Sequence, residues 1–115
     1  MQNMPENFLY QLLLADGTTL NNCSCGLYEN TVTCFLKDIP FAEAFMYFVD
    51  PNSFSTIIFD IVYSMGYTDR FEYSGIEKVT SVIQKVGQVE VSLEGHNIQV
   101  RKSRIYNQET EVIDE

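Results

Sequence analysis

The chain has 115 residues, of which 45% are hydrophobic and 13% aromatic, and a chain of this length forms one domain with a single core. Its 16 acidic and seven basic residues give a net charge of −9, which opposes direct binding to a phosphate backbone and favours a basic partner, although acidic surfaces also serve solubility alone. No apolar run approaches the roughly 18 residues of a membrane span and residues 1–6 are polar, so we expect a cytosolic protein with no membrane partner.

The first elements expected along the chain are two strands joined by a tight turn. An apolar run, Phe8–Leu14, is followed by Asp16-Gly17 and then by Thr18–Leu20. Asp-Gly between two apolar runs is the strongest short signal for a β-hairpin. We expect these two runs to pair, and the chain to continue from them as one antiparallel meander through Phe35-Leu36.

All three cysteines lie in the next segment, as Cys23-Ser24-Cys25 and Cys34. A two-residue turn at Glu29-Asn30 would set Cys25 opposite Cys34, and Cys23 would share their face because side chains two apart on a strand point the same way. With His96, the only histidine, these thiols would make a tetrahedral Cys₃His set. We therefore predict a structural zinc ion with the ligands Cys23, Cys25, Cys34 and His96.

Two other interpretations of the cysteines stay open. The same face carries Leu27, Val32 and Leu36, and free cysteine is among the most buried residue types, so thiols that only filled the core would give the same pattern. A three-residue turn would instead place Cys34 opposite Ser24, on the wrong face for a metal. Disulfide bonding is the remaining alternative, and the odd number of cysteines argues against it.

A short helix is expected over residues 41–48. Pro40 suits a helix start because its φ angle is already set and it has no N–H to leave unpaired. The apolar positions recur at three- and four-residue spacing and form one stripe that we predict to face the core: Phe41, Ala44, Phe45 and Phe48. The sequence Asp50-Pro51-Asn52-Ser53 then breaks the chain.

Two strands are expected next. Residues 55–63 are rich in β-branched and aromatic side chains and predict a central strand, in which Asp60 is either exposed or paired. After a turn at Gly66, residues 70–73 predict its partner strand.

The last third of the chain predicts three more strands. Residues 76–86 fit both a helical period and a strand, and their β-branched content favours the strand. Residues 89–93 alternate cleanly between apolar and polar. We expect them to form a last hairpin with residues 98–100 across Gly95.

The predicted fold class is therefore α+β: a β-rich antiparallel sheet with at least one short helix in a single small domain. This domain spans residues 1–106. Residues 107–115 are polar and acidic apart from Val112-Ile113, and we expect this tail to fray.

No catalytic motif is present in the sequence. It contains no phosphate-binding glycine loop, no His-Glu-x-x-His and no Gly-x-Ser-x-Gly, and nothing next to His96 marks a nucleophile. A metal-dependent enzyme would need an open zinc position in place of four protein ligands. We expect a protein that is not an enzyme.

Several stretches together resemble small proteins of phages and prophages of Gram-positive bacteria, over most of residues 8–94. The resemblance is carried by Leu12–Leu20, Phe48–Ile57, Phe71–Gly75, Lys78–Val82 and Val89–Leu93. Small acidic proteins of this kind include anti-CRISPR proteins that inhibit type II-A Cas9. The resemblance implies a non-catalytic inhibitor in the bacterial host cytoplasm, which binds a basic nucleic-acid-binding surface of Cas9 and blocks DNA loading.

The charge distribution indicates where such a partner would bind. Residues 1–69 carry eight acids and a single base, Lys37. We predict that the partner-binding residues are the acids at or near predicted turns and the helix: Asp16, Glu29, Asp38, Glu43 and Asp50. The only basic run, Arg101-Lys102-Ser103-Arg104, fits a solvated strand end beside the acidic tail better than an RNA contact.

A structural or assembly protein of the virion is the alternative function. In that class the β-rich domain would associate with copies of itself through its sheet.

Overall fold

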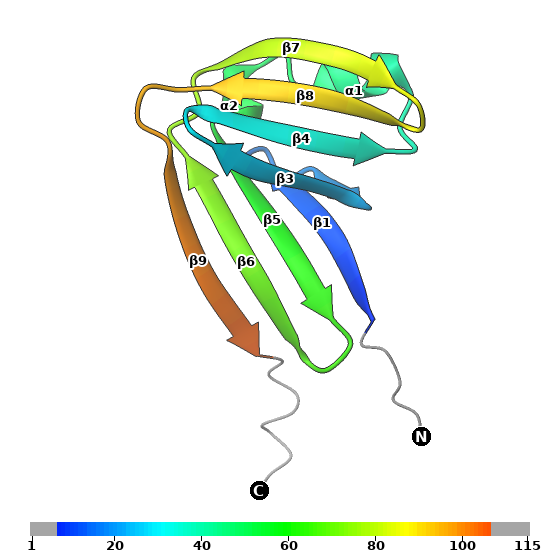
Figure 1. Ribbon diagram of the computed structural model, residues 1–115, viewed down its shortest axis with the longest axis vertical. Coiled ribbons are helices and arrows are strands. Elements are labelled where there is room, and N and C mark those ends of the chain that lie inside the picture. Colours follow the sequence, from blue (N-terminus) through cyan, green and yellow to red (C-terminus); the bar gives the residue numbers. More distant parts are fainter. Residues whose placement is uncertain (1–6, 107–115) are drawn as a thin grey trace, which may run out of the picture.

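Nine strands form two antiparallel sheets in the computed structural model, which describes residues 7–106 (Figure 1). Sheet A contains β1 (Phe8–Leu14), β2 (Thr19–Asn21), β5 (Thr56–Tyr63), β6 (Tyr67–Ser74) and β9 (Gln99–Tyr106), in the spatial order β2-β1-β5-β6-β9. Sheet B contains β3 (Cys23–Tyr28), β4 (Thr31–Lys37), β7 (Lys78–Lys85) and β8 (Gln88–Glu94), in the order β3-β4-β8-β7. Two short helices, α1 (Phe41–Tyr47) and α2 (Pro51–Phe54), connect β4 to β5. The expected β-rich α+β domain is confirmed.

The core lies between the inner faces of the two sheets. Sheet B contributes the alternating apolar residues of its strands, among them Val32, Leu36 and Leu93, which are fully buried. Sheet A contributes Leu12 and Ile57, which are also fully buried. Each such aliphatic side chain stabilises the fold by roughly 1.5–3 kcal/mol on burial.

Both N-terminal hairpins form as the turn chemistry predicts. Strands β1 and β2 pair across Asp16-Gly17. Strands β3 and β4 pair across Glu29-Asn30 in the predicted register, with Cys25 opposite Cys34. The expectation of one meander through these strands is wrong, because β2 belongs to sheet A and β3 to sheet B. Two consecutive strands can lie in different sheets whenever each buries its own apolar face, which local patterning does not reveal.

The predicted hairpin of residues 89–93 with 98–100 is also wrong. Strand β8 pairs with β4 and β7 in sheet B, whereas β9 pairs with β6 in sheet A. The chain crosses between the sheets at Gly75 and again at Gly95, where the two backbones touch: a Cβ on Gly95 would collide with the carbonyl of Gly75. The Gly95 signal marks this crossing and not a hairpin turn. Residues 78–85 form a strand, as their β-branched content predicts.

The helical segment differs from the prediction in two ways. Ala44 and Phe48 are buried, but Phe41 and Phe45 are 41% and 51% exposed and lie against each other, so only half of the aromatic stripe faces the core. A seven-residue helix is too short to bury a full stripe against one edge of the sandwich. The predicted break at residues 50–53 lies mostly within α2, because the Asp50 carboxylate accepts a hydrogen bond from the backbone N–H of Asn52 and Pro51 opens the helix.

Candidate functional site

The acidic residues fall into two groups by their partners. Within residues 7–106, five acids form ion pairs with a base or with His96: Asp60, Asp69, Glu72, Glu77 and Glu90. Six acids form none with the described bases: Asp16, Glu29, Asp38, Glu43, Asp50 and Glu94. The second group, which we call the unpaired acids, contains all five predicted partner-binding residues.

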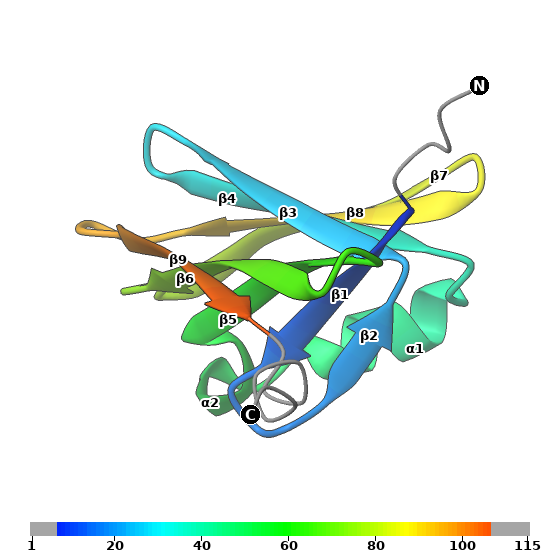
Figure 2. The same cartoon turned by 90° about the horizontal axis from the view of Figure 1, so that it is seen from below.

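Four of the unpaired acids gather around the helices, and we call them the helix-side acids: Asp16, Asp38, Glu43 and Asp50. Figure 2 shows α1 and α2 on the same side of the molecule as β2 and the β1–β2 turn. Asp16 lies in that turn and contacts α2 through its hydrogen bond from the Ser53 hydroxyl. Asp38 lies three residues before the start of α1, Glu43 lies within α1 and Asp50 caps α2. The structure therefore brings these four to one side.

Glu29 does not join them. It lies in the β3–β4 turn, at the opposite end of β4 from Asp38. Glu94 is near it, because Glu94 pairs with Thr31 at that same end. Glu29 and Glu94 thus lie together at one end of sheet B, and Asp38 follows β4 at its other end.

Two of the helix-side acids also hold local structure. Hydrogen bonds from the side chain and the backbone N–H of Thr18, and a weaker one from Ser53, keep the pKa of Asp16 below its ordinary value. Asp50 accepts from the N–H of Asn52 at 3.0 Å. Asp38 and Glu43 have no such backbone role among the described hydrogen bonds; the Glu43 carboxylate accepts from the Tyr47 hydroxyl at 2.7 Å. These two are the acids that can be changed without removing a cap.

The predicted zinc ligands are only partly brought together: Cys25 lies directly opposite Cys34, whereas His96 lies in an exposed connection. Cys23, Cys25 and Cys34 are free thiols on the buried face of sheet B. The Cys23 thiol donates to the carbonyl of Asn21 at 3.2 Å. Burial raises the pKa of the Cys23 thiol. The pKa of Cys34 is raised mainly by its hydrogen bond with Cys25 and also by burial. Both shifts disfavour the thiolate, which is the form that binds a metal.

His96 lies in the connection between β8 and β9, and its side chain is 92% exposed. Its Nδ1 lies 2.9 Å from a carboxylate oxygen of Glu77, and this hydrogen bond lowers the pKa of Glu77. Across residues 7–106 no three His, Cys, Asp or Glu side chains are grouped to hold a metal ion. Zinc bound by Cys23, Cys25, Cys34 and His96 stays a prediction.

The basic run lies within β9 and faces β6. Arg104 makes two hydrogen bonds to Asp69, at 2.7 and 3.0 Å, and Arg101 lies 3.8 Å from Glu72. The predicted pairing with the acidic tail involves residues outside the described range. The partners in sheet A were hidden from sequence reasoning because they lie about 30 positions away along the chain.

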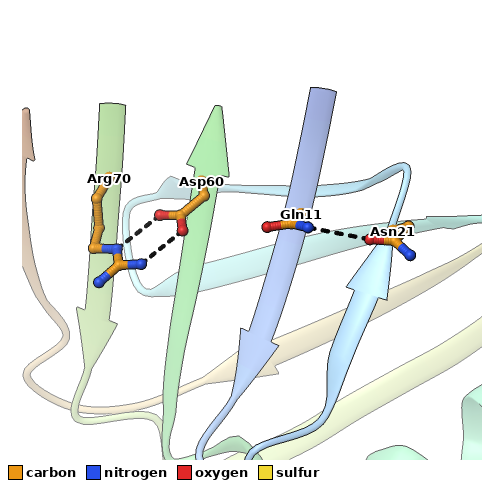
Figure 3. Close-up of polar contacts among 4 residues, drawn as sticks. All are labelled: Gln11, Asn21, Asp60 and Arg70. Atoms are coloured by element: carbon orange, nitrogen blue, oxygen red, sulfur yellow. Dashed lines mark hydrogen bonds and ion pairs between the residues drawn. The ribbon is translucent and has the colours of Figure 1, made fainter. Parts of the chain in front are cut away.

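A fully formed ion pair lies at the centre of the outer face of sheet A. The Arg70 guanidinium donates two hydrogen bonds of 2.8 Å to Asp60, next to the Gln11–Asn21 hydrogen bond on the same face (Figure 3). Asp60 is 4% exposed, so of the two predicted states it is the paired one. Its negative charge is paired with Arg70 within the sheet and is not available to a partner.

Sequence reasoning missed an aromatic row across sheet A. The register places Phe8 opposite Tyr63, Tyr63 opposite Tyr67 and Tyr67 opposite Tyr106. The centroids of successive rings lie 5.9, 4.7 and 6.1 Å apart, in the range of favourable aromatic pairs. We call these four residues the aromatic row. Each was visible as a strand residue, but their alignment depends on the pairing of four distant strands.

The comparisons with known proteins give this chain no relative. No protein-family model matches it, and no curated protein or solved structure matches it either. Among the described residues, neither helix has the length and hydrophobicity of a membrane-spanning segment.

Proposed function

We propose that this protein is a non-catalytic binding protein whose helix-side acids bind a basic surface of another protein. The observation that supports the proposal is the separation of its charges: four acids pair with an arginine or lysine and Glu77 with His96, while Asp16, Asp38, Glu43 and Asp50 lie on one side with no ion pair to a described base. Unpaired charges of one sign attract an oppositely charged surface and speed its association.

The proposed partner is the nucleic-acid-binding surface of a type II CRISPR effector. Cas9 holds its guide–target heteroduplex in a positively charged channel and reads its PAM with arginines. An acidic domain that occupies such a surface would block DNA loading without any chemistry. The resemblance to small phage proteins supports this choice of partner, and the chain's net charge of −9 agrees with it.

The test compares two double variants that remove the same charge from different ends of sheet B. Asp38→Asn with Glu43→Gln removes two helix-side acids and leaves the Asp16 and Asp50 hydrogen bonds intact. Glu29→Gln with Glu94→Gln removes the two unpaired acids at the other end. Binding to guide-loaded type II-A Cas9, and to a panel of related effectors, is measured by biolayer interferometry together with DNA loading by the effector.

We expect the helix-side double variant to bind at least about tenfold more weakly, which corresponds to roughly 1.4 kcal/mol, and the control to change affinity by less than about threefold. Equal losses of affinity in both variants would mean that binding depends on net charge alone, which would contradict a specific binding surface. The effector proposal is abandoned if the unmodified protein neither binds the panel nor changes DNA loading.

A further inference from the structure

We propose that two copies of this protein associate through the uncovered part of the inner face of sheet A. This part, which we call the overhang face, consists of the aromatic row and its neighbours on the same side of the sheet: Tyr10, Ile61, Asp69, Lys102 and Arg104. It is separate from the helix-side acids. The inference therefore goes beyond the proposed function and can fail without affecting it.

The overhang face has the composition of a core face, but within residues 7–106 neither sheet B nor a helix covers it. Figure 1 shows β1, β5, β6 and β9 extending well past sheet B. Along β1 the inward-facing side chains change from buried Leu14 and Leu12 to Tyr10, 38% exposed, and Phe8, 48% exposed. The composition stays that of a core while the exposure rises, and aromatic residues that remain exposed in this way are enriched at protein interfaces.

Charge favours a second copy as the occupant. The overhang face carries one acid and two bases, and Asp69 is already paired with Arg104. Both bases lie over aromatic rings: the Arg104 guanidinium lies 4.1 Å from the Tyr67 ring centre and the Lys102 ammonium 5.4 Å from that of Phe71. Two molecules that each carry −9 repel each other least where this nearly neutral face meets its own copy.

The alternative contact between copies, edge to edge along β9, is opposed by charge. β9 is a sheet edge and all eight of its residues are exposed. Antiparallel pairing of two β9 strands about Ser103 would set Lys102 of one copy opposite Arg104 of the other. Like charges directly opposed destabilise a strand pair, and basic residues are a common protection of edge strands. Of these two surfaces, we therefore choose the overhang face as the contact between copies.

The geometry also limits the affinity. The overhang face offers nine residues, against the roughly 20–30 per partner of a standard interface. We expect a weak dimer with a Kd on the order of 10⁻⁵ to 10⁻⁴ M.

The experiment is sedimentation equilibrium of the full chain from about 10 µM to 1 mM, a range that brackets this Kd. The mass should rise from the monomer value of 13.2 kDa toward twice that value. Phe8→Glu and Tyr106→Glu, at the two ends of the aromatic row, should each weaken association at least about tenfold. Tyr28→Glu is the control, because Tyr28 is 77% exposed on β3 and the change adds the same charge.

Far-UV circular dichroism confirms that each variant is folded before its mass is measured, and both row positions are exposed enough to tolerate the change. In NMR spectra of the unmodified protein, concentration-dependent shifts should concentrate on β1, β5, β6 and β9. A mass of 13.2 kDa at every concentration, or an equal loss of association in Tyr28→Glu, overturns the proposal.

Discussion

At the scale of single residues, Asp60 shows how an acidic protein neutralises a charge inside its fold. It is the one buried charged residue among residues 7–106 and lies on the central strand of sheet A. A buried carboxylate is tolerated only when it is paired and hydrogen-bonded. Arg70 supplies both bonds from the neighbouring strand, with its side chain 33% exposed.

Arg70→Met should lower the free energy of unfolding by roughly 2–4 kcal/mol, because it leaves the Asp60 carboxylate buried without its partner; the partial exposure of Arg70 places the effect below that of a fully buried pair. Urea unfolding followed by circular dichroism measures it. Arg101→Met on β9 is the matched control, since its contact with Glu72 is 3.8 Å long and 80% exposed at the arginine. A loss in the control as large as in Arg70→Met would contradict the assignment.

The reactivity of the three cysteines also depends on their burial. The pKa values of Cys23 and Cys34 are raised, which makes the thiolate, the form that attacks disulfides and binds metal, harder to form. The described arrangement supports core thiols more than a zinc site.

We expect the folded protein at pH 8 to react slowly with Ellman's reagent and to release all three thiols on unfolding in guanidinium. Zinc content is measured in parallel by elemental analysis of untagged protein; core thiols without a metal would give far less than one ion per chain. A 1:1 zinc content that is lost in Cys25→Ser would contradict this expectation and establish the hairpin cluster as a metal site. Retention of zinc in His96→Ala would then place the fourth ligand elsewhere.

At the scale of elements, two glycines differ in whether their surroundings leave room for a side chain. Gly26 lies within β3, opposite Thr33, and nothing lies within 4 Å of where its Cβ would be. Gly95 lies where the chain crosses between the sheets, and its Cβ position is filled by the carbonyl of Gly75. The first glycine only adds flexibility, whereas the second permits the crossing.

Gly26→Thr should raise the free energy of unfolding by about 0.5–1 kcal/mol, because threonine favours strands and would pair with Thr33. Gly95→Ala should lower it by more than about 1 kcal/mol, because two backbones must separate. Thermal unfolding of both variants measures the difference. If Gly95→Ala were neutral, the close crossing of the two connections would be wrong.

At the scale of the whole molecule, the two proposed surfaces differ in chemistry. The helix-side acids act through charge, and salt screens charge over a Debye length of about 8–10 Å at 0.1–0.15 M. The overhang face acts through apolar and aromatic contact, which salt does not weaken, while the repulsion between two copies at −9 falls as salt rises. A change in salt concentration therefore distinguishes binding through the helix-side acids from self-association through the overhang face.

Raising the salt concentration from about 0.05 to 0.5 M should weaken binding to a basic partner about tenfold or more and should leave self-association unchanged or strengthen it. Biolayer interferometry and sedimentation equilibrium on the same preparation measure the two effects. If both affinities fell together, the overhang face would depend on charge, contrary to its composition.

The sequence by itself determined the local structure of this protein. Tight turns and alternation fix the β1–β2 and β3–β4 hairpins, including the Cys25–Cys34 register, because the hydrogen bonds and side-chain contacts involved lie within a few residues of each other. The partner-binding residues predicted from the sequence are five of the six acids that have no ion pair within residues 7–106, and Glu94 is the one that was missed. Only the tertiary structure decided which strands share a sheet.

The tertiary structure placed β8 and β9 in different sheets and aligned the aromatic row across four strands. It also placed Arg70 and Arg104 beside their acids and Glu29 away from the helix side. Strand partners far apart in the chain are selected by the burial of the whole apolar surface at once, and alternation along one strand is the same whichever strand lies beside it.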